Sequence, residues 1–441
     1  MLLKRYDLET ARKTILRRRR SEPETYPQAL LDNLAERFGP GTAPEDAVAQ
    51  LLRSVREGGD QALRKWTEEL DGARLDSFLV PRQDLEDSYN ALDPVLRDAL
   101  LHSAQRIREF HARQPIASWT TDEMGGLIGQ RVTPVRNVGV YVPGGSAPLP
   151  SSLLMSVIPA QVAGVKQIIV CTPPNPHAAI LAAAYICQID QVYQLGGAQA
   201  IGAMAYGTES VPAVDKIVGA GNLFVTLAKQ QVFGVVGLDG LAGPTETMVI
   251  ADATARPAWV ASDLLAQAEH DPLASAILLT PDEGVAEAVQ REVERQAPLL
   301  SRAEIITQAL KRRGGVVITP DLQTAAQVAD AYAAEHLCLS VEDPNALAAM
   351  IQNAGGFFLG EGSFEVLGDY VAGPSHVMPT GGTARFNSPL NVLDFVKISS
   401  IVQLDQATSA RLSALAGEIA RAERLTAHAA AADQRARGND V

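Results

Sequence analysis

The chain has 441 residues, a formal net charge of −13, a hydrophobic content of 46% and a charged content of 20%. This composition excludes a disordered chain, and the length predicts two or three domains with a large buried core. An acidic surface repels phosphate backbones, so we expect no nucleic acid among the main partners.

Residues 1–27 are predicted to form an N-terminal arm that ends near a run of four arginines at 17–20. The run is interpreted either as a solvated helix end or as part of an arm between subunits. No apolar segment follows it, as a secretory signal would require, and no apolar run approaches the about 20 residues of a membrane span. We therefore expect a soluble cytoplasmic protein that does not bind a membrane.

From 28 to 134 the pattern is helical, because stretches such as LLDNLAERF place apolar residues at i, i+3 and i+4. We expect this helical part to pack on the catalytic domain. From 135 onward, short apolar runs such as QIIVCTP alternate with helix-length segments, which is typical of parallel βαβ units.

The alternation occurs in two blocks, at 135–240 and at 241–391. The predicted fold class is α/β, with two doubly wound Rossmann-like parallel-sheet domains and helical N-terminal and C-terminal extensions. The tail at 392–441 is predicted to be helical, and its narrow apolar stripe suits packing on a partner.

The three cysteines, Cys171, Cys187 and Cys338, have no C-x-x-C spacing, so neither a disulfide framework nor a thiolate zinc cluster is expected. We interpret all three as core residues. Of the seven histidines, three lie in segments where a structural role is expected. They are His102, His111 and His177.

Three glycine-rich loops lie where strands of the first block are predicted to end: PGGS at 143–146, GGAQ at 196–199 and GAGN at 219–222. Glycine permits close backbone approach, and a helix start offers free N–H groups to a phosphate. None completes G-x-G-x-x-G, so tight turns and a dinucleotide site remain alternatives.

Four polar pairs stand out in the second block and the tail. They are Gln267 with His270, Glu335 with His336, Asp369 with His376, and Glu423 with His428. Gln267 and His270 are three residues apart, so both project from one helix face. Each pair also has a plain explanation, as a surface histidine or a capping carboxylate.

Together these segments resemble the histidinol dehydrogenase family, over about residues 30–430. The matching stretches are VGVYVPGGSAPLPSSLLM, GGAQAIGAMAYGTESVP, VDKIVGAGNLFVTLAKQQV, LAGPTETMVIAD, DLLAQAEHDP, AAEHL, GDYVAGPSHVMPTGGTARF and AERLTAH. The resemblance implies two NAD-dependent oxidations that convert L-histidinol, through an aldehyde, to L-histidine, the last step of histidine biosynthesis.

Carried over residue by residue, the resemblance assigns roles to the polar pairs and the loops. It implies one zinc ion per subunit on Gln267, His270, Asp369 and His428. It implies a general base pair of Glu335 and His336, which accept protons from the alcohol and from water. It implies NAD contacts at Tyr141, Gln199 and Asn222. It implies substrate contacts at Thr245, Gln267, His270, His336, Asp369, His376, Glu423 and His428.

The family also implies a homodimer in which the C-terminal tail completes the partner's site, although the sequence leaves open which subunit His428 serves. The chain departs from the family pattern where Thr245 replaces serine and where Ala220, Pro374 and Ser375 replace other residues. These departures leave open another small alcohol as substrate. A separate alternative is a zinc hydrolase in which Glu335 activates water and no dinucleotide is used. A non-catalytic binding module is a remote further alternative.

Overall fold

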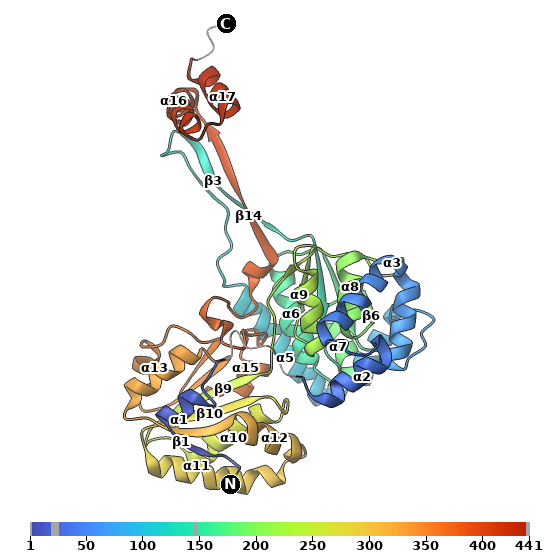
Figure 1. Ribbon diagram of the computed structural model, residues 1–441, viewed down its shortest axis with the longest axis vertical. Coiled ribbons are helices and arrows are strands. Elements are labelled where there is room, and N and C mark those ends of the chain that lie inside the picture. The colour runs from blue at the N-terminus through green and yellow to red at the C-terminus, as the bar shows by residue number, and fades with distance from the viewer. Residues whose placement is uncertain (1, 19–25, 145–147, 438–441) are drawn as a thin grey trace. The chain divides into compact units, whose positions relative to one another are not determined.

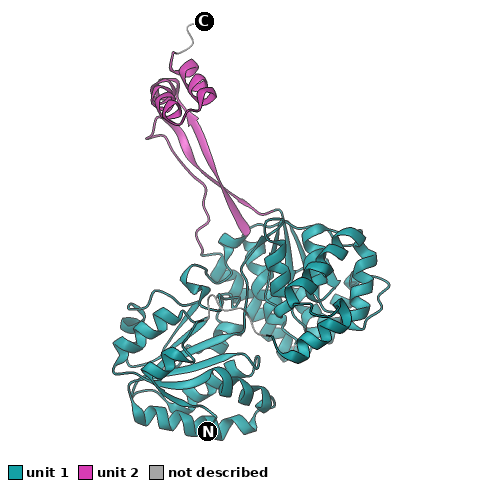
Figure 2. Cartoon of the chain, viewed as in Figure 1, with its two compact units in different colours: residues 1–113, 136–394 teal, residues 114–135, 395–441 magenta. Residues whose placement is uncertain are grey.

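The computed structural model describes residues 2–18, 26–144 and 148–437 (Figure 1). The chain divides into two compact units, one formed by 1–113 with 136–394 and the other by 114–135 with 395–441 (Figure 2). We call these unit 1 and unit 2. Within the described ranges, no helix combines the length and apolar character that crossing a membrane demands.

The first sheet of unit 1 has five parallel strands in the order β6-β5-β4-β7-β8. Their bounds are β4 Asn137–Tyr141, β5 Gln167–Thr172, β6 Val192–Gln194, β7 Lys216–Val218 and β8 Gly237–Leu238. In register, Val140 of β4 lies between Val170 of β5 and Val218 of β7. The chain thus leaves β4 on one side and returns to its other side, which makes the β4–β7 boundary the switch point of the sheet.

Helices surround this sheet because its strands are apolar on both faces. The connecting helices are α6 Pro150–Val162, α7 Ala178–Ile186, α8 Gly197–Tyr206 and α9 Leu223–Val232. The preceding helices are α2 Gln28–Phe38, α3 Pro44–Asp71, α4 Arg82–Ala91 and α5 Pro94–His111. Helix α3 packs on α8 and α9, α4 on α7, and α5 on α6, so this helical part covers the first sheet.

The second sheet of unit 1 has six parallel strands in the order β1-β11-β10-β9-β12-β13. Their bounds are β1 Arg5–Asp7, β9 Glu246–Ala251, β10 Ser275–Thr280, β11 Gly314–Ile318, β12 His336–Ser340 and β13 Gly356–Leu359. The helices of this domain are α1 Leu8–Lys13, α10 Pro257–Ala268, α11 Glu283–Gln296, α12 Ala303–Arg313, α13 Leu322–Tyr332, α14 Pro344–Ala348 and α15 Glu365–Tyr370.

The period-2 alternation of strand β9 divides the core of this domain between the two faces of the sheet. Val249 and Ala251 join the cluster formed with α10, α11 and α12. Met248 and Ile250 join the cluster formed with α13 and α14. Both faces are therefore covered, and the predicted fold class of two doubly wound α/β domains is confirmed.

The N-terminal arm contributes a strand that the sequence did not predict. Residues Arg5 to Asp7 pair in parallel with Val316 to Ile318 and so cover the edge strand β11. Leu3 is fully buried in the same domain. Of the two interpretations of the arginine run, the solvated helix end is wrong for Arg18, which is partly buried in an ion pair with Glu246. Arg19 and Arg20 lie outside the described residues.

Unit 2 combines an antiparallel sheet in the order β14-β3-β2 with two helices that pack on each other. The elements are β2 Trp119–Thr121, β3 Gly126–Pro134, β14 Val396–Leu404, α16 Gln406–Ala422 and α17 Thr426–Ala436. The helical prediction is thus wrong for β2, β3 and β14. In VKISSIVQL the β-branched residues favour a strand, and β3 supplies its hydrogen-bonding partner.

The predicted core and structural residues lie where expected. Cys171, Cys187 and Cys338 are buried free thiols. His177 caps α7, its ring Nδ1 accepting a hydrogen bond from the Ala179 N–H at 3.1 Å. The other two histidines belong to α5, where the His102 ring lies 3.1 Å from the Asp98 carbonyl oxygen and His111 is buried.

Candidate active site

The predicted dinucleotide residues gather at the carboxyl ends of β4 and β7. Tyr141 ends β4, and its hydroxyl accepts a hydrogen bond from the Gly197 N–H at 3.0 Å. Gly219 follows β7 with φ at +106°, and a Cβ there would lie 2.2 Å from the Tyr141 carbonyl oxygen. Only glycine fits this approach, so the loop at 219–222 lies directly on the end of β4.

Gln199 and Asn222 belong to the same end of the sheet, at the starts of α8 and α9. Gln199 is buried; its Nε2 donates to Asp71 at 2.9 Å, while its Oε1 has no hydrogen-bond partner among the described residues. Asn222 is exposed and caps α9 by accepting from the Val225 N–H at 3.1 Å. Of the predicted loop at 143–146, residues 145 and 146 lie outside the described ranges.

The predicted base pair lies at the amino end of the second sheet. His336 is the first residue of β12, beside Thr247 of β9 and Gly356 of β13. Glu335 precedes it, and both side chains are buried. Glu335 Oε2 accepts hydrogen bonds from Thr245 Oγ1 at 2.6 Å and from the Glu246 N–H at 3.0 Å.

The His336 ring contacts groups on both sides. Its Nδ1 lies 3.3 Å from the Glu246 carbonyl oxygen, and its Nε2 lies 3.4 Å from Asp369 Oδ1. Nε2 is buried and makes no hydrogen bond within the part of the chain that the structure describes. A buried ring nitrogen without such a partner is available to a substrate or a ligand.

Burial and neighbouring charges shift the pKa values of Glu335 and His336. Burial raises the pKa of Glu335 to about 7, although His336 opposes the shift. Burial alone would lower the pKa of His336, but the Glu335 and Asp369 carboxylates outweigh it and raise that pKa. Both groups therefore hold protons more tightly than usual, which makes them effective proton acceptors once deprotonated.

A chain of polar contacts connects this pair to the first domain. Asp369, near the end of α15, has a lowered pKa because the nearby histidines outweigh its burial. The backbone oxygen of Asp369 lies 2.7 Å from His376 Nδ1, and His376 Nε2 lies 3.2 Å from Ser152 Oγ. Ser152 belongs to α6, which begins at the carboxyl end of the first sheet, so the two ends share one polar network.

Gln267 contacts the segment that binds Glu335. Its amide contacts Thr245 Oγ1; with the amide oxygen turned to the Glu246 N–H at 3.0 Å, its nitrogen donates to Glu365 Oε1 at 3.1 Å. Burial raises the pKa of Glu365 to about 8, which favours the protonated form of this side chain. Thr245 stands where the family pattern has serine, and its hydroxyl still makes the contacts with Glu335 and Gln267.

The metal ligands implied by the resemblance are divided between the two units. Gln267, His270 and Asp369 belong to unit 1, and His428 belongs to unit 2, as does Glu423. His270 and Asp369 are close enough to couple electrostatically. The described residues contain no group of three or more His, Cys, Asp or Glu side chains that could hold a metal ion.

The chemistry of the donors in unit 1 nevertheless fits zinc. Imidazole and carboxylate are ordinary zinc ligands, and an amide oxygen is an uncommon one. One of the donors, Asp369, has its Oδ1 3.4 Å from His336 Nε2. The resemblance implies three donors in unit 1, one fewer than a tetrahedral protein site has, so the implied site requires a further donor.

The two domains of unit 1 contact each other near the segment that follows His376. A small cavity of about 30 Å³ is lined by Gly219 and Ala220 from the first domain and by Val377 and Met378 from the second. The Gly243 N–H donates to Thr380 Oγ1 at 2.6 Å nearby. The carboxyl end of one sheet therefore faces the segment that follows His376.

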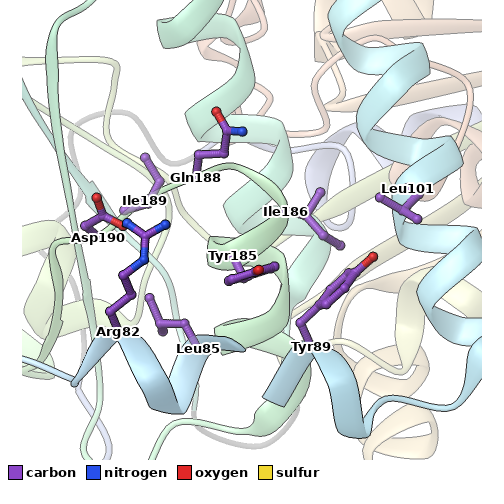
Figure 3. A pocket seen from close by; sticks show the side chains of 9 residues that line it. All are labelled: Arg82, Leu85, Tyr89, Leu101, Tyr185, Ile186, Gln188, Ile189 and Asp190. Atoms are coloured by element: carbon purple, nitrogen blue, oxygen red, sulfur yellow. The ribbon is translucent and has the colours of Figure 1, made fainter. Parts of the chain in front are cut away.

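A cavity of about 270 Å³ lies elsewhere, between α4, α5 and α7 (Figure 3). Arg82 and Asp190 form an ion pair on its wall, and the rings of Tyr89 and Tyr185 lie 4.9 Å apart. None of the residues that the sequence singled out lines it. We therefore do not place the active site there.

Four residues of the polar network were not predicted from the sequence. They are Arg18, Ser152, Glu246 and Glu365. Glu365 had a usable signal, because it lies four residues before Asp369 and shares its helix face. The other three acquire their partners only through the packing of distant segments.

Comparisons with known proteins extend over nearly the whole chain. The family model described as histidinol dehydrogenase matches residues 41–436. The histidinol dehydrogenase of Thermus thermophilus is 50% identical over 391 residues, covering 89% of this chain and 94% of that protein. That of Aquifex aeolicus is 49% identical over 389 residues, covering 88% and 91%. The crystal structure of histidinol dehydrogenase from Elizabethkingia anophelis is similar with a TM-score of 0.90 at 34% identity, covering 100% of this chain and 99% of that one.

Proposed function

The chain belongs to the histidinol dehydrogenase family, and from this membership we propose that it oxidises L-histidinol to L-histidine in two NAD-dependent steps through an aldehyde. This is the last step of histidine biosynthesis. One observation carries the proposal beyond the family: the buried pair of Glu335 and His336 is connected through His376 and Ser152 to the switch point of a doubly wound sheet.

Each proposed oxidation removes a hydride and a proton. In the first, His336 accepts the hydroxyl proton of the alcohol while the hydride leaves its carbon. In the second, Glu335 accepts a proton from the water that adds to the aldehyde, while the protonated His336 returns its proton to the aldehyde oxygen. The neutral His336 then accepts a proton from the hydrate as the second hydride leaves, and both side chains release their protons to solvent. NAD, when bound, takes up the hydride of each step, so one substrate yields two NADH.

The proposed NAD site is the switch point between β4 and β7, with contacts at Tyr141, Gln199 and Asn222. Ligands of doubly wound sheets bind beyond the carboxyl ends of the strands. The close approach of Gly219 to β4 supports this position, as does the start of α8, where Gly196 provides no side-chain cap.

We further propose that Gln267, His270 and Asp369 hold one zinc ion together with His428. When bound, zinc would supply a Lewis acid that orients the amino alcohol. Thr245, His376 and Glu423 are proposed to contact the substrate. The three-donor set of unit 1 supports the need for a ligand from the tail.

The tail is proposed to be exchanged between two copies in a homodimer. Mixing two inactive variants, His336→Asn and His428→Asn, tests this. A mixed dimer with exchanged tails has one site in which both histidines are intact. We therefore expect each mixed dimer to recover up to about half the activity of a wild-type dimer. Mixed dimers that stay inactive would show that each tail serves its own subunit.

The function itself is tested by incubating the purified protein with L-histidinol and NAD. We expect two NADH per substrate and loss of turnover after chelation, with recovery on adding zinc. A panel of other amino alcohols and diols separates this substrate from its analogues by kcat/KM. No turnover of L-histidinol by the zinc-loaded protein would contradict the proposal.

A further inference from the structure

Arg18 of the N-terminal arm makes an unusually complete set of contacts for a residue within an arginine run. Its side chain is 15% exposed. Both terminal nitrogens contact the Glu246 carboxylate, with Nη2 at 2.8 Å from Oε2. Nε and Nη2 also donate to the Tyr332 carbonyl oxygen at 3.0 and 2.8 Å. Such a bidentate pair fixes geometry as well as charge.

The partner carboxylate belongs to the residue whose backbone holds the proposed base pair. The Glu246 N–H donates to Glu335 Oε2, and the Glu246 carbonyl oxygen lies 3.3 Å from His336 Nδ1. Both backbone atoms of one residue thus contact Glu335 and His336. A shift of the Glu246 side chain is therefore transmitted directly to the orientation of both side chains.

The second contact of Arg18 fixes the chain segment that leads into the same pair. Helix α13 ends at Tyr332, and Ala333 follows in the left-handed region with φ at +53°. Arg18 binds the last carbonyl of this helix, and its guanidinium lies 3.6 Å above the Tyr332 ring. A cation at a helix C-terminus is favourable, and Glu335 comes two residues after Ala333.

We propose that Arg18 is a positioning residue, which clamps the start of β9 to the end of α13 and so holds Glu335 and His336 in register. This inference rests on the proposed function of that pair. Arg18 touches neither residue and acts through Glu246 and α13. A purely structural arm would stabilise the domain without altering turnover per folded molecule.

The chain offers a matched control on the same arm. Arg5 Nη2 forms an ion pair with Glu283 at 2.9 Å, and these side chains are 33% and 70% exposed. This pair ties β1 to α11 and contacts none of the residues at the proposed site. Arg5→Gln therefore removes an arm contact without disturbing Glu246 or α13.

The test measures kcat, KM for L-histidinol, KM for NAD, zinc content and Tm for wild type, Arg18→Gln, Arg18→Lys and Arg5→Gln. For Arg18→Gln we expect kcat to fall about 30-fold with KM for NAD within twofold, because a misplacement near 1 Å can cost about 100-fold. Arg18→Lys should recover part of the loss, since it restores the charge but not the bidentate geometry. Arg5→Gln should keep the wild-type kcat.

The outcomes separate the two proposals. A wild-type protein that does not oxidise L-histidinol overturns the proposed function and this inference with it. An active wild type together with an Arg18→Gln variant within twofold in kcat overturns the inference alone. If Arg18→Gln does not fold, Arg18→Lys decides: a fall of at least threefold at unchanged KM for NAD supports the clamp, and a wild-type kcat overturns it.

Discussion

The five-stranded and six-stranded sheets of unit 1 are both parallel and doubly wound, yet their predicted site residues lie at opposite strand ends. In the first sheet Tyr141 ends β4 and Gly219 follows β7. In the second, Glu246 begins β9 and His336 begins β12. The two domains therefore present a carboxyl end and an amino end to the same network.

The difference follows from what each strand end offers. Carboxyl ends of parallel strands lead into helix N-termini, whose free N–H groups favour anions such as a pyrophosphate. Amino ends follow helix C-termini, whose carbonyls favour cations. Arg18 is a cation near β9 and β12 in the described part of the chain, and the proposed zinc ion would add another.

The largest effect is expected at the amino end of the second sheet. His336→Asn should lower kcat by at least about 1,000-fold, because it removes the proposed proton acceptor of both oxidations, while zinc content stays normal. The measurement is steady-state NADH formation together with metal analysis. The control is His102→Asn, on α5, which should keep wild-type turnover; a normal rate in His336→Asn would contradict the base assignment.

Glu335→Gln should have the next largest effect, a fall in kcat of about 100-fold, with NADH per L-histidinol dropping from two towards one. Because burial raises the pKa of Glu335 to about 7, the wild-type rate should rise with pH through about 7, and the variant should lose this dependence. The exposed Glu287→Gln serves as control. Two NADH per substrate in Glu335→Gln would assign the water-activating role to another residue.

A smaller effect is expected at the carboxyl end of the first sheet. Gly219→Ala should raise KM for NAD about tenfold, because its Cβ would meet the Tyr141 carbonyl oxygen at 2.2 Å. Gly39→Ala is a matched control, since Gly39 has the same φ of +106° and nothing within 4 Å. Equal effects of the two variants on KM for NAD would mean that backbone strain alone is responsible.

The smallest effect concerns the free energy of unfolding. It depends on a buried carboxyl group of the second domain to which no catalytic role is assigned. Burial, with Glu361 nearby, raises the pKa of Asp263 to about 7, far above its unfolded value near 4. Unfolding therefore releases a proton between pH about 4 and 7, and the free energy of unfolding decreases as pH rises through that window.

Asp263→Asn should accordingly be more stable than wild type at pH 8, by about 2–4 °C in Tm, with the difference shrinking towards pH 5. Asp252 provides the opposite case, because its hydrogen bonds to Thr254 and Glu342 outweigh its burial and lower its pKa. Asp252→Asn should be less stable than wild type at pH 8. A Tm difference for Asp263→Asn that does not vary with pH would exclude the titration.

The sheets of unit 1 could be predicted because their strands are continuous apolar runs separated by helix-length segments. The strand pair of unit 2 could not, since β14 takes its hydrogen-bond partner from β3, far away in the chain. Similarly, Glu335 with His336 could be singled out as adjacent polar residues at a helix-to-strand junction. The partners of Ser152 and Arg18 depend on tertiary packing that no local pattern encodes.

The pairing of β1 with β11 imposes an order on the assembly of the chain. Arg5 is synthesised long before its strand partner Val316, and Arg18 long before Tyr332. Contacts of such high sequence separation form slowly, and a growing chain leaves them unmade. The first domain can therefore fold on the ribosome well before the contacts that position the proposed base pair can form. A chain interrupted before β11 would have neither a complete second sheet nor a positioned Glu335 and His336.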